Sequence, residues 1–469
     1  MHDTPLLIAK VPDCYLPERE YILRLLFQEW LGQRIELQIH AAPYTEITVD
    51  RHPARLMVSD ILFQTLESQW LKASSLPSRP LRRWQVLREV PEAQVCEDTL
   101  PLLYPATEAE APIVTWDGNG ASIGFDLFGS CFFMLTRYEE CVVSVRDLHD
   151  RFPARASIAY QEGFLLRPIV NEYLEVLWAV MRRVWQFLTR PERRHRVVPT
   201  HDVDWPAIGY RTPWSLVLRG AAGDLIKRRD ARLAAARLRA KIGGDFACDP
   251  ANTFDWLMTL SEQHGLRSEF YFIADHTAGI RDGVYALEEP FIQSLMRQIH
   301  QRGHVIGLHP SYESYHSPEQ IAHEFSHLRA VAESLSCIPS RWGGRQHYLR
   351  WENPTTWQAW DDAGLDYDST VGFADHVGFR SGVCYDYPTF NLRTRQQLRL
   401  REHPLIVMDC TLFDYMGLSD GEATEVLSLL ARRCRMHSGE FVLLWHNSCL
   451  LTEAQCRFYT DALHILSKG

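Results

Sequence analysis

The stretch Val197-Val198-Pro199-Thr200-His201-Asp202-Val203-Asp204 joins an apolar run to two carboxylates. Its first five residues, 197–201, are a strand candidate. Further strand candidates and helix candidates alternate after it, the strands at 268–274, 305–308, 365–367, 405–408 and 441–445 and the helices at 253–263, 290–302, 318–335, 354–363, 421–435 and 452–466. Such alternation predicts parallel strands with crossover helices, and six or more units in ~270 residues favour a (β/α) barrel over an open sheet.

Carboxylates and imidazoles follow several of these strand candidates directly. Asp202 and Asp204 follow the first, His309 follows 305–308, Asp409 follows 405–408 and His446 follows 441–445. The carboxyl ends of parallel barrel strands converge on one face, where active sites are built. Since alternate residues of an extended segment point the same way, Asp202 and Asp204 can both face such a site.

Four short motifs of this region resemble those of the polysaccharide deacetylases, the chitooligosaccharide deacetylase-like carbohydrate esterases. They are Thr200-His201-Asp202-Val203-Asp204, Gly303-His304-Val305-Ile306-Gly307-Leu308-His309, Gly344-Arg345-Gln346-His347-Tyr348 and Leu443-Leu444-Trp445-His446. The order and placement of these motifs together carry the resemblance, which covers roughly residues 197–469. It implies a distorted (β/α) barrel of the polysaccharide deacetylase type.

The resemblance also implies a role for each matched residue. Asp202 would be the general base and His446 the general acid, with Asp409 orienting His446 and Arg345 holding Asp202 ionised. Asp204 and His309 would bind a divalent metal, expected to be Zn²⁺, which makes water nucleophilic and stabilises the oxyanion. The expected substrate-binding residues are Tyr312, Tyr348 and Arg380.

The third metal ligand has two candidates. The family usually has another His four residues after the first, and here that position is Glu313, whose carboxylate could ligate zinc. A subgroup of the family resembles the His-Pro-Ser-Tyr at 309–312 followed by Arg-x-His-Tyr at 345–348, which points to His347 instead. We favour His347 and regard His304 and His316 as outside the site; for His201, structural and functional roles both stay open.

The N-terminal 125 residues carry no chemical signature. Residues 1–125 predict a small α/β accessory domain, with a helix near 21–27 and neighbouring strands near 34–39 and 54–58. Residues 126–196 predict a helical connecting region, and the barrel follows at 197–469. The runs at 125–140 and 163–168 resemble the accessory region that precedes a subgroup of these barrels in bacterial surface-polysaccharide biosynthesis.

Composition limits the class of protein. The net charge of −10 argues against general nucleic-acid binding. Eleven cysteines without a CxxC pair favour reduced thiols, the first residues show no signal peptide, and the most apolar stretch is too amphipathic to span a bilayer, so we expect a cytoplasmic protein. Trp205, Trp342, Trp351 and Trp445 could stack on sugar rings or simply pack.

One basic segment, residues 219–241, stands apart. Its eight basic residues alternate with Leu225, Ile226, Leu233 and Leu238, which predicts a partly amphipathic helix inserted after the first barrel strand. It is either a solvated face or a patch for an anionic glycan, a lipid-linked diphosphate or the inner face of the membrane.

The function expected from the sequence is therefore metal-dependent hydrolysis of an N-acyl (acetyl or formyl) or O-acetyl group on a carbohydrate, in O-antigen or capsule assembly. The substrate could be lipid-linked or nucleotide-linked, and the accessory domain could shape the substrate groove or form a homodimer contact. Two alternatives stay open, a non-catalytic sugar-binding barrel that lost its metal and an amidohydrolase for a small non-sugar amide.

Overall fold

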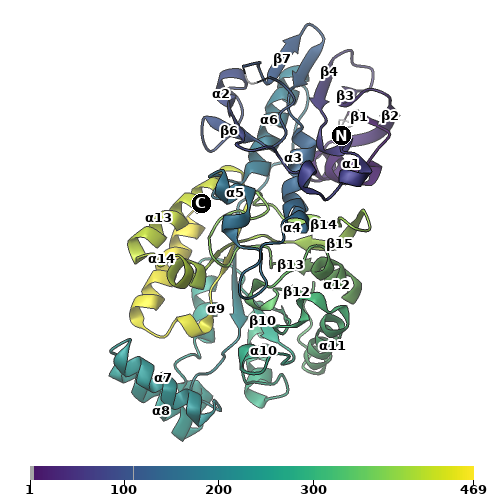
Figure 1. Ribbon diagram of the computed structural model, residues 1–469. Helices are drawn as coiled ribbons and strands as arrows, with labels where there is room; N and C mark the ends of the chain where they lie inside the picture. The colour runs from purple at the N-terminus through teal and green to yellow at the C-terminus, as the bar shows by residue number, and fades with distance from the viewer. Residues whose placement is uncertain (1–4, 109, 469) are drawn as a thin grey trace.

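A nine-stranded sheet forms the centre of the C-terminal part of the chain in the computed structural model, which describes residues 5–108 and 110–468 (Figure 1). Every neighbouring pair is parallel except β14 and β15, which are antiparallel. The order across the sheet is β14 (Tyr387–Asn391), β15 (Gln396–Glu402), β13 (Tyr367–Asp368), β12 (Gly343–Gly344), β11 (Val305–His309), β10 (Glu269–Ile273), β9 (Arg196–Val203), β17 (Glu440–Leu444) and β16 (Leu405–Met408).

The predicted alternation of strands and helices is confirmed. All six strand candidates and all six helix candidates are present within a few residues of their expected bounds, and β10, β11 and β17 are almost wholly buried, as expected for strands covered on both faces. The helices that connect them are α9 (Phe254–Gln263), α10 (Pro290–Gln301), α11 (Pro318–Ser334), α12 (Thr355–Ala363), α13 (Asp420–Met436) and α14 (Glu453–Ser467).

The sheet curls without closing into a complete barrel. Among the described residues, β16 and β14 are the two edges of the strand order, and no pairing joins them. The segment at 369–386 lies beside β16, where the Gly378 N–H donates to the Ile406 carbonyl (3.0 Å). The expected barrel is therefore an open one, because an irregular segment occupies the place of a closing strand.

The N-terminal part contains a separate six-stranded sheet in the order β2 (Arg34–His40), β1 (Leu6–Pro12), β3 (Tyr44–Val49), β4 (Arg55–Ser59), β8 (Gly120–Ile123) and β7 (Val114–Asp117). Both strand candidates of this region form, as β2 and β4, but the expectation that they are neighbours is wrong. β1 and β3 lie between them, because β1 pairs in parallel with β2 and antiparallel with β3. A small two-stranded sheet joins β5 (Arg82–Gln85) to β6 (Thr99–Leu102).

Helices pack beside this N-terminal sheet and lead towards the larger one (Figure 1). The predicted helix near 21–27 is split into α1 (Leu16–Leu23) and a π-helical stretch at Arg24–Trp30. The helical region that follows is made of α3 (Leu127–Leu135), α4 (Tyr138–Val142), α5 (Ile158–Gln161) and α6 (Ile169–Val184), and α2 (Val86–Glu89) precedes β6.

A buried ion-pair cluster connects the N-terminal helices to the C-terminal sheet region. Glu140 of α4 accepts hydrogen bonds from Arg137 (2.8 Å) and from Arg380 (2.9 Å), and all three side chains are almost completely shielded from solvent. Breaking one partner of such a cluster would leave a buried charge uncompensated, at a cost of about 3–5 kcal/mol. Arg380 is therefore one of the residues that join the two parts of the chain.

The basic segment forms two helices rather than the single one expected. They are α7 (Trp214–Ile226) and α8 (Ala231–Gly243), which pack on one another and project from the lower end of the molecule (Figure 1). The chain breaks between them because Arg229 has a φ of 53° and the Asp230 carboxylate caps α8 by accepting from the Leu233 N–H (2.8 Å). We call this pair the α7–α8 hairpin.

Two sequence expectations bear on membranes. Within residues 5–108 and 110–468, no helix combines the length and the apolar character that crossing a bilayer requires. The opening residues Met1–Thr4, on which the expectation of no signal peptide partly rests, lie outside the described residues.

Candidate metal centre and active site

Asp202 lies near the end of β9 and faces a buried arginine. Nη1 of Arg345 donates to Oδ1 of Asp202 (2.9 Å), and both side chains are almost fully buried. Arg345 is itself held in place, because its Nε donates to the Ser369 carbonyl (2.9 Å) and its Nη2 to the Ser369 hydroxyl (3.0 Å). This leaves Oδ2 of Asp202 as the oxygen that faces the rest of the site.

His309 ends β11 with one ring nitrogen fixed and the other free. Its Nδ1 lies 2.6 Å from the Arg345 carbonyl oxygen, to which it can only donate, so Nε2 carries the lone pair. That Nε2 lies 3.1 Å from Oδ1 of Asp204 and 3.7 Å from Oδ2 of Asp202. The backbone carbonyl thus selects the tautomer that a metal requires.

His347 is oriented in the same way by a carboxylate. Its Nδ1 lies 3.0 Å from Oδ1 of Asp282, and its Nε2 lies 3.7 Å from Oδ2 of Asp204. The residues that follow, Tyr348 and Leu349, have φ values of 58° and 56°. Two successive non-glycine residues in this left-handed region make an uncommon turn directly after His347.

The three side chains fit a divalent metal. Asp204 Oδ1, His309 Nε2 and His347 Nε2 are buried and have no hydrogen-bond partner, and the donor atoms of the three residues lie within 4.8 Å of one another. Burial raises the pKa of Asp204, but the neighbouring imidazoles of His347 and His309 outweigh it and hold this pKa well below its usual range. One carboxylate and two imidazoles, with space beside them, are a typical set for a catalytic zinc.

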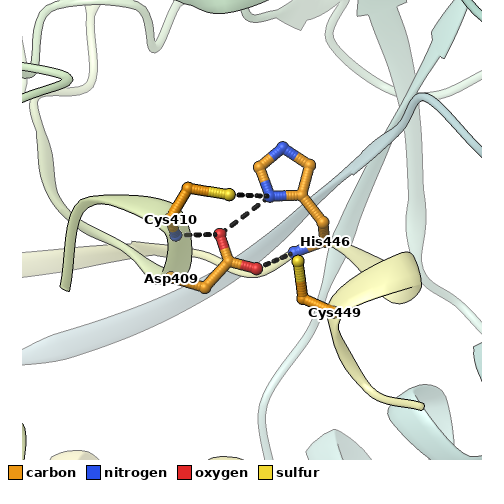
Figure 2. Close-up of side chains that lie close together, drawn as sticks. All are labelled: Asp409, Cys410, His446 and Cys449. Atoms are coloured by element: carbon orange, nitrogen blue, oxygen red, sulfur yellow. Dashed lines mark hydrogen bonds and ion pairs between the residues drawn. The ribbon is translucent and has the colours of Figure 1, made fainter. Parts of the chain in front are cut away.

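His446 and Asp409 form a hydrogen-bonded pair beside this centre (Figure 2). Oδ1 of Asp409 lies 2.8 Å from Nδ1 of His446, and Oδ2 accepts from the His446 backbone N–H (2.8 Å). Burial lowers the pKa of His446, but the Asp409 carboxylate outweighs it and raises this pKa well above 6.5. The Nε2–H of His446, 3.6 Å from Oδ2 of Asp204, is thus available as a proton donor.

One cavity of about 370 Å³ is lined by Asp202, Asp204, His309, His347 and His446, while Arg345 and Asp409 support these residues from behind its wall. Tyr348, expected to bind substrate, lines it, and so does Trp205, the one tryptophan of the four named above that does. Two arginines from elsewhere in the sequence also line it. They are Arg281, from the loop after β10, and Arg151, which precedes α5 and donates to the Tyr348 carbonyl (3.0 Å). The connecting region before β9 therefore contributes directly to the wall of the cavity.

Other expected site residues lie away from the cavity. Glu313 is 45 % exposed in its side chain and pairs with Arg350 (2.9 Å), so the geometry brings His347 and not Glu313 to Asp204 and His309. Arg380 is occupied by Glu140, and the Tyr312 hydroxyl bonds Nδ1 of His149 (2.9 Å) without lining the cavity. The structure thus places neither of these two expected substrate-binding residues at the cavity.

His201 and His304 have partners outside the cavity. His201 is fully buried, stacks on Phe270 and lies 2.7 Å through Nδ1 from the Trp445 carbonyl oxygen, and burial lowers its pKa to about 4. His304 accepts from the Ser268 N–H through Nδ1 (3.0 Å). Neither histidine lines the cavity. Of the two roles left open for His201, the geometry therefore favours the structural one.

Besides Arg151 and Arg281, sequence reasoning missed Asp282, the carboxylate that orients His347. It follows β10 by nine residues, within the 3₁₀ turn Gly279–Asp282, and not at a strand end. The signal in the sequence was an acidic residue before Gly283 in a loop on the catalytic face. Such a signal is weak, because Asp-Gly pairs are common in ordinary turns.

Comparisons with known proteins give partial matches. A family of unknown function (DUF7033) matches residues 7–186, which precede every proposed metal ligand. The search of curated proteins returns no significant match.

Solved structures resemble the chain distantly. A protein from Mycobacterium smegmatis assigned as a polysaccharide deacetylase has 15% identity over 60% of this chain and 86% of its own, with a TM-score of 0.39. Puue allantoinase has 11% identity over 59% and 88%, with a TM-score of 0.35. The Xyl-CE4 domain of a multidomain xylanase from the hindgut metagenome of Trinervitermes trinervoides has 10% identity over 58% and 82%, with a TM-score of 0.26. At these TM-scores no activity of these proteins transfers to this chain.

Proposed function

We propose that this protein is a metal-dependent hydrolase that removes an N-acyl (acetyl or formyl) or O-acetyl group from a carbohydrate. One observation carries the proposal. The unpartnered donor atoms of Asp204, His309 and His347 meet in a cavity that also presents the carboxylate of Asp202 and the imidazole of His446. Hydrolysis of an acyl group needs a base, an electrophilic centre and an acid, and these residues supply all three.

Asp204, His309 and His347 would hold the metal, which we take to be Zn²⁺. When bound, the metal supplies Lewis acidity to the water and to the acyl oxygen. Oδ2 of Asp202 accepts the proton of the attacking water, since Arg345 occupies Oδ1 and keeps the carboxylate oriented. Arg345 is always protonated, so Asp202 stays paired with a fixed positive charge throughout.

His446 supplies the proton for the departing amine or alcohol from Nε2. Asp409 fixes the ring through Nδ1 and through the backbone N–H, so the proton-bearing Nε2 points to the same side as Asp204. Tyr348 and Trp205 offer ring faces for a sugar, and Arg281 favours a substrate with an anionic group, such as a sugar linked to a diphosphate. Arg151 is already paired with Asp147 (2.8 Å) and shapes the wall of the cavity.

We also propose that the reaction belongs to bacterial surface-polysaccharide assembly at the inner face of the cytoplasmic membrane. The α7–α8 hairpin supports this location. It exposes Trp214, Leu218, Leu225, Ile226 and Ile242, each at least half exposed, on helices that carry mostly exposed basic residues. Apolar residues beside basic residues are what an anionic bilayer surface binds.

The test is a release assay on the full chain. Acetate and formate should be measured after incubation with nucleotide-linked sugars, lipid-linked glycans, O-acetylated oligosaccharides and ureides, with and without added zinc. We expect zinc-dependent release from a carbohydrate and none from the ureides. Release from ureides alone would favour the small-amide amidohydrolase. Zinc-independent binding of sugars without any release would favour the non-catalytic barrel.

A further inference from the structure

A second group of metal-binding side chains lies beside the first. Among the described residues, Asp409, Cys410, His446 and Cys449 each offer one donor atom within 4.8 Å of the others (Figure 2). Cys410 follows β16 and Cys449 follows β17, so two adjacent parallel strands deliver the four residues. Sγ of Cys410 lies 3.9 Å from Nδ1 of His446. We call these four residues the thiol cluster.

The donor set of the thiol cluster suits a soft divalent ion. Two thiolates, one imidazole nitrogen and one carboxylate oxygen complete a tetrahedral zinc shell, and thiolates favour Zn²⁺ and Cd²⁺ over Mg²⁺ and Ca²⁺. The two cysteines are partly exposed, whereas Cys131, Cys384 and Cys434 are buried in the core. Cys410 packs at the edge of a small apolar cluster that contains Leu405 and Met408, and its thiol and that of Cys449 remain partly exposed.

The thiol cluster also has its own opening. Cys410 and Cys449 line the catalytic cavity and a second cavity of about 300 Å³, which Phe413, Asp420 and Phe458 also line. The thiol cluster thus stands in the wall between the two cavities. An ion can reach the sulfur atoms from the second cavity without crossing the site of Asp204, His309 and His347.

We propose that Asp409, Cys410, His446 and Cys449 form a second metal site that takes Zn²⁺ or a similarly soft divalent ion. The ion binds the two sulfur atoms, Oδ1 of Asp409 and Nδ1 of His446. Binding expels the two thiol protons and the proton on Nδ1 to solvent, because each donor must offer a lone pair.

Occupation of this site changes the state of His446. Nδ1 cannot donate to Asp409 and offer its lone pair to a metal at the same time, so the Asp409–His446 hydrogen bond is lost. This consequence rests on the proposed function: the metal-bound ring of His446 is no longer an imidazolium, so it no longer serves as the proton donor. The first equivalent of zinc would activate the enzyme and the second would inhibit it.

The test is a Cd²⁺ titration of the full chain, stripped with chelator and kept under a phosphine reductant. We expect two equivalents to bind, with an ultraviolet thiolate-to-cadmium charge-transfer band that follows one of them. Cys410→Ser/Cys449→Ser should bind one equivalent without the band, and circular dichroism melting should check that this variant folds. Cys456→Ser, which changes a partly exposed thiol outside the thiol cluster, should keep both equivalents and the band.

The variant His309→Ala/His347→Ala separates this inference from the proposed function. It should lose one equivalent yet keep the charge-transfer band. If it keeps two equivalents, the first site is refuted and the thiol cluster is not. A wild-type chain without the band, or a band that persists in Cys410→Ser/Cys449→Ser, overturns the second site.

Discussion

Asp282→Asn tests how much the carboxylate of Asp282 supports one proposed metal ligand, His347. Asp282 is fully buried, and Oδ1 accepts from His347 Nδ1 (3.0 Å) and from the Tyr312 N–H (2.7 Å), while Oδ2 accepts from the Ala278 N–H (2.7 Å). An asparagine that keeps its oxygen towards His347 turns its amide N–H₂ towards the Ala278 N–H. One buried donor loses its acceptor, and His347 loses the negative charge that orients it.

The magnitude follows from these contacts. Removing a carboxylate that supports a metal-binding histidine lowers metal affinity about 10- to 100-fold, which corresponds to about 1.4–2.8 kcal/mol. The unpartnered amide at Ala278 should lower the free energy of unfolding by a further ~1–3 kcal/mol even without metal. The zinc affinity is measured by competition with a chromophoric chelator, and stability by urea unfolding of the metal-free chain.

A matched control distinguishes support of the metal from support of the fold. The buried Asp249 accepts backbone N–H groups as Asp282 does, from Ile208 (3.0 Å), Gly209 (2.7 Å) and others, but no hydrogen bond joins it to a histidine. Asp249→Asn should lose similar stability and keep its zinc affinity. If Asp282→Asn binds zinc as tightly as the unchanged chain, or if Asp249→Asn weakens zinc equally, the assignment of His347 as a supported ligand is refuted.

Three further predictions concern the base, the hairpin and stability against pH. Asp202→Asn should lower turnover by about 10²–10⁴-fold with full metal occupancy, checked by acyl release and elemental analysis; unchanged turnover would exclude Asp202 as the base. The unchanged chain should sediment with phosphatidylglycerol vesicles and not with pure phosphatidylcholine vesicles. Ile226→Asp and Arg229→Glu should each weaken sedimentation with the phosphatidylglycerol vesicles. Equal sedimentation of all three chains would exclude the hairpin as a membrane contact. His403 and Glu440 form a pair (2.6 Å) in which burial opposes the mutual attraction but does not overcome it, so the pKa of His403 is raised and that of Glu440 lowered. The contribution of His403 to the free energy of unfolding is complete below its unfolded pKa of about 6.5 and is lost as pH rises through its folded pKa. The contribution of Glu440 is complete above its unfolded pKa of about 4.5 and is lost as pH falls through its folded pKa. The Tm difference between the unchanged chain and His403→Gln should therefore be largest near pH 5–6 and shrink towards pH 9, and a constant difference would contradict this account.

The strand-end placement of polar residues was predictable from the sequence. Apolar runs that end in Asp202, His309 and His446 place these side chains on one face of any parallel sheet, and the structure brings them to one cavity. His347 was preferred on a motif resemblance, and its orientation towards Asp204 depends on a hydrogen bond with Asp282, which no periodicity reveals.

Features that depend on tertiary contacts were not predictable. The open edge of the sheet follows from the packing of the segment at 369–386 beside β16. The expectation that β2 and β4 are neighbours was wrong because the order of strands in a sheet is not encoded in the local sequence pattern. Arg380 is a buried arginine paired with Glu140 across 240 residues, so its expected substrate role rested on residue type alone. Arg151 and Asp282 reach the site from loops far from any matched motif.

Anomalous diffraction from crystals soaked in a single equivalent of zinc tests the central claim most directly. The account predicts an anomalous peak at the zinc edge within bonding distance of a carboxylate oxygen of Asp204, Nε2 of His309 and Nε2 of His347. A peak at Glu313, or no peak at Asp204 in crystals that contain zinc elsewhere, would contradict it.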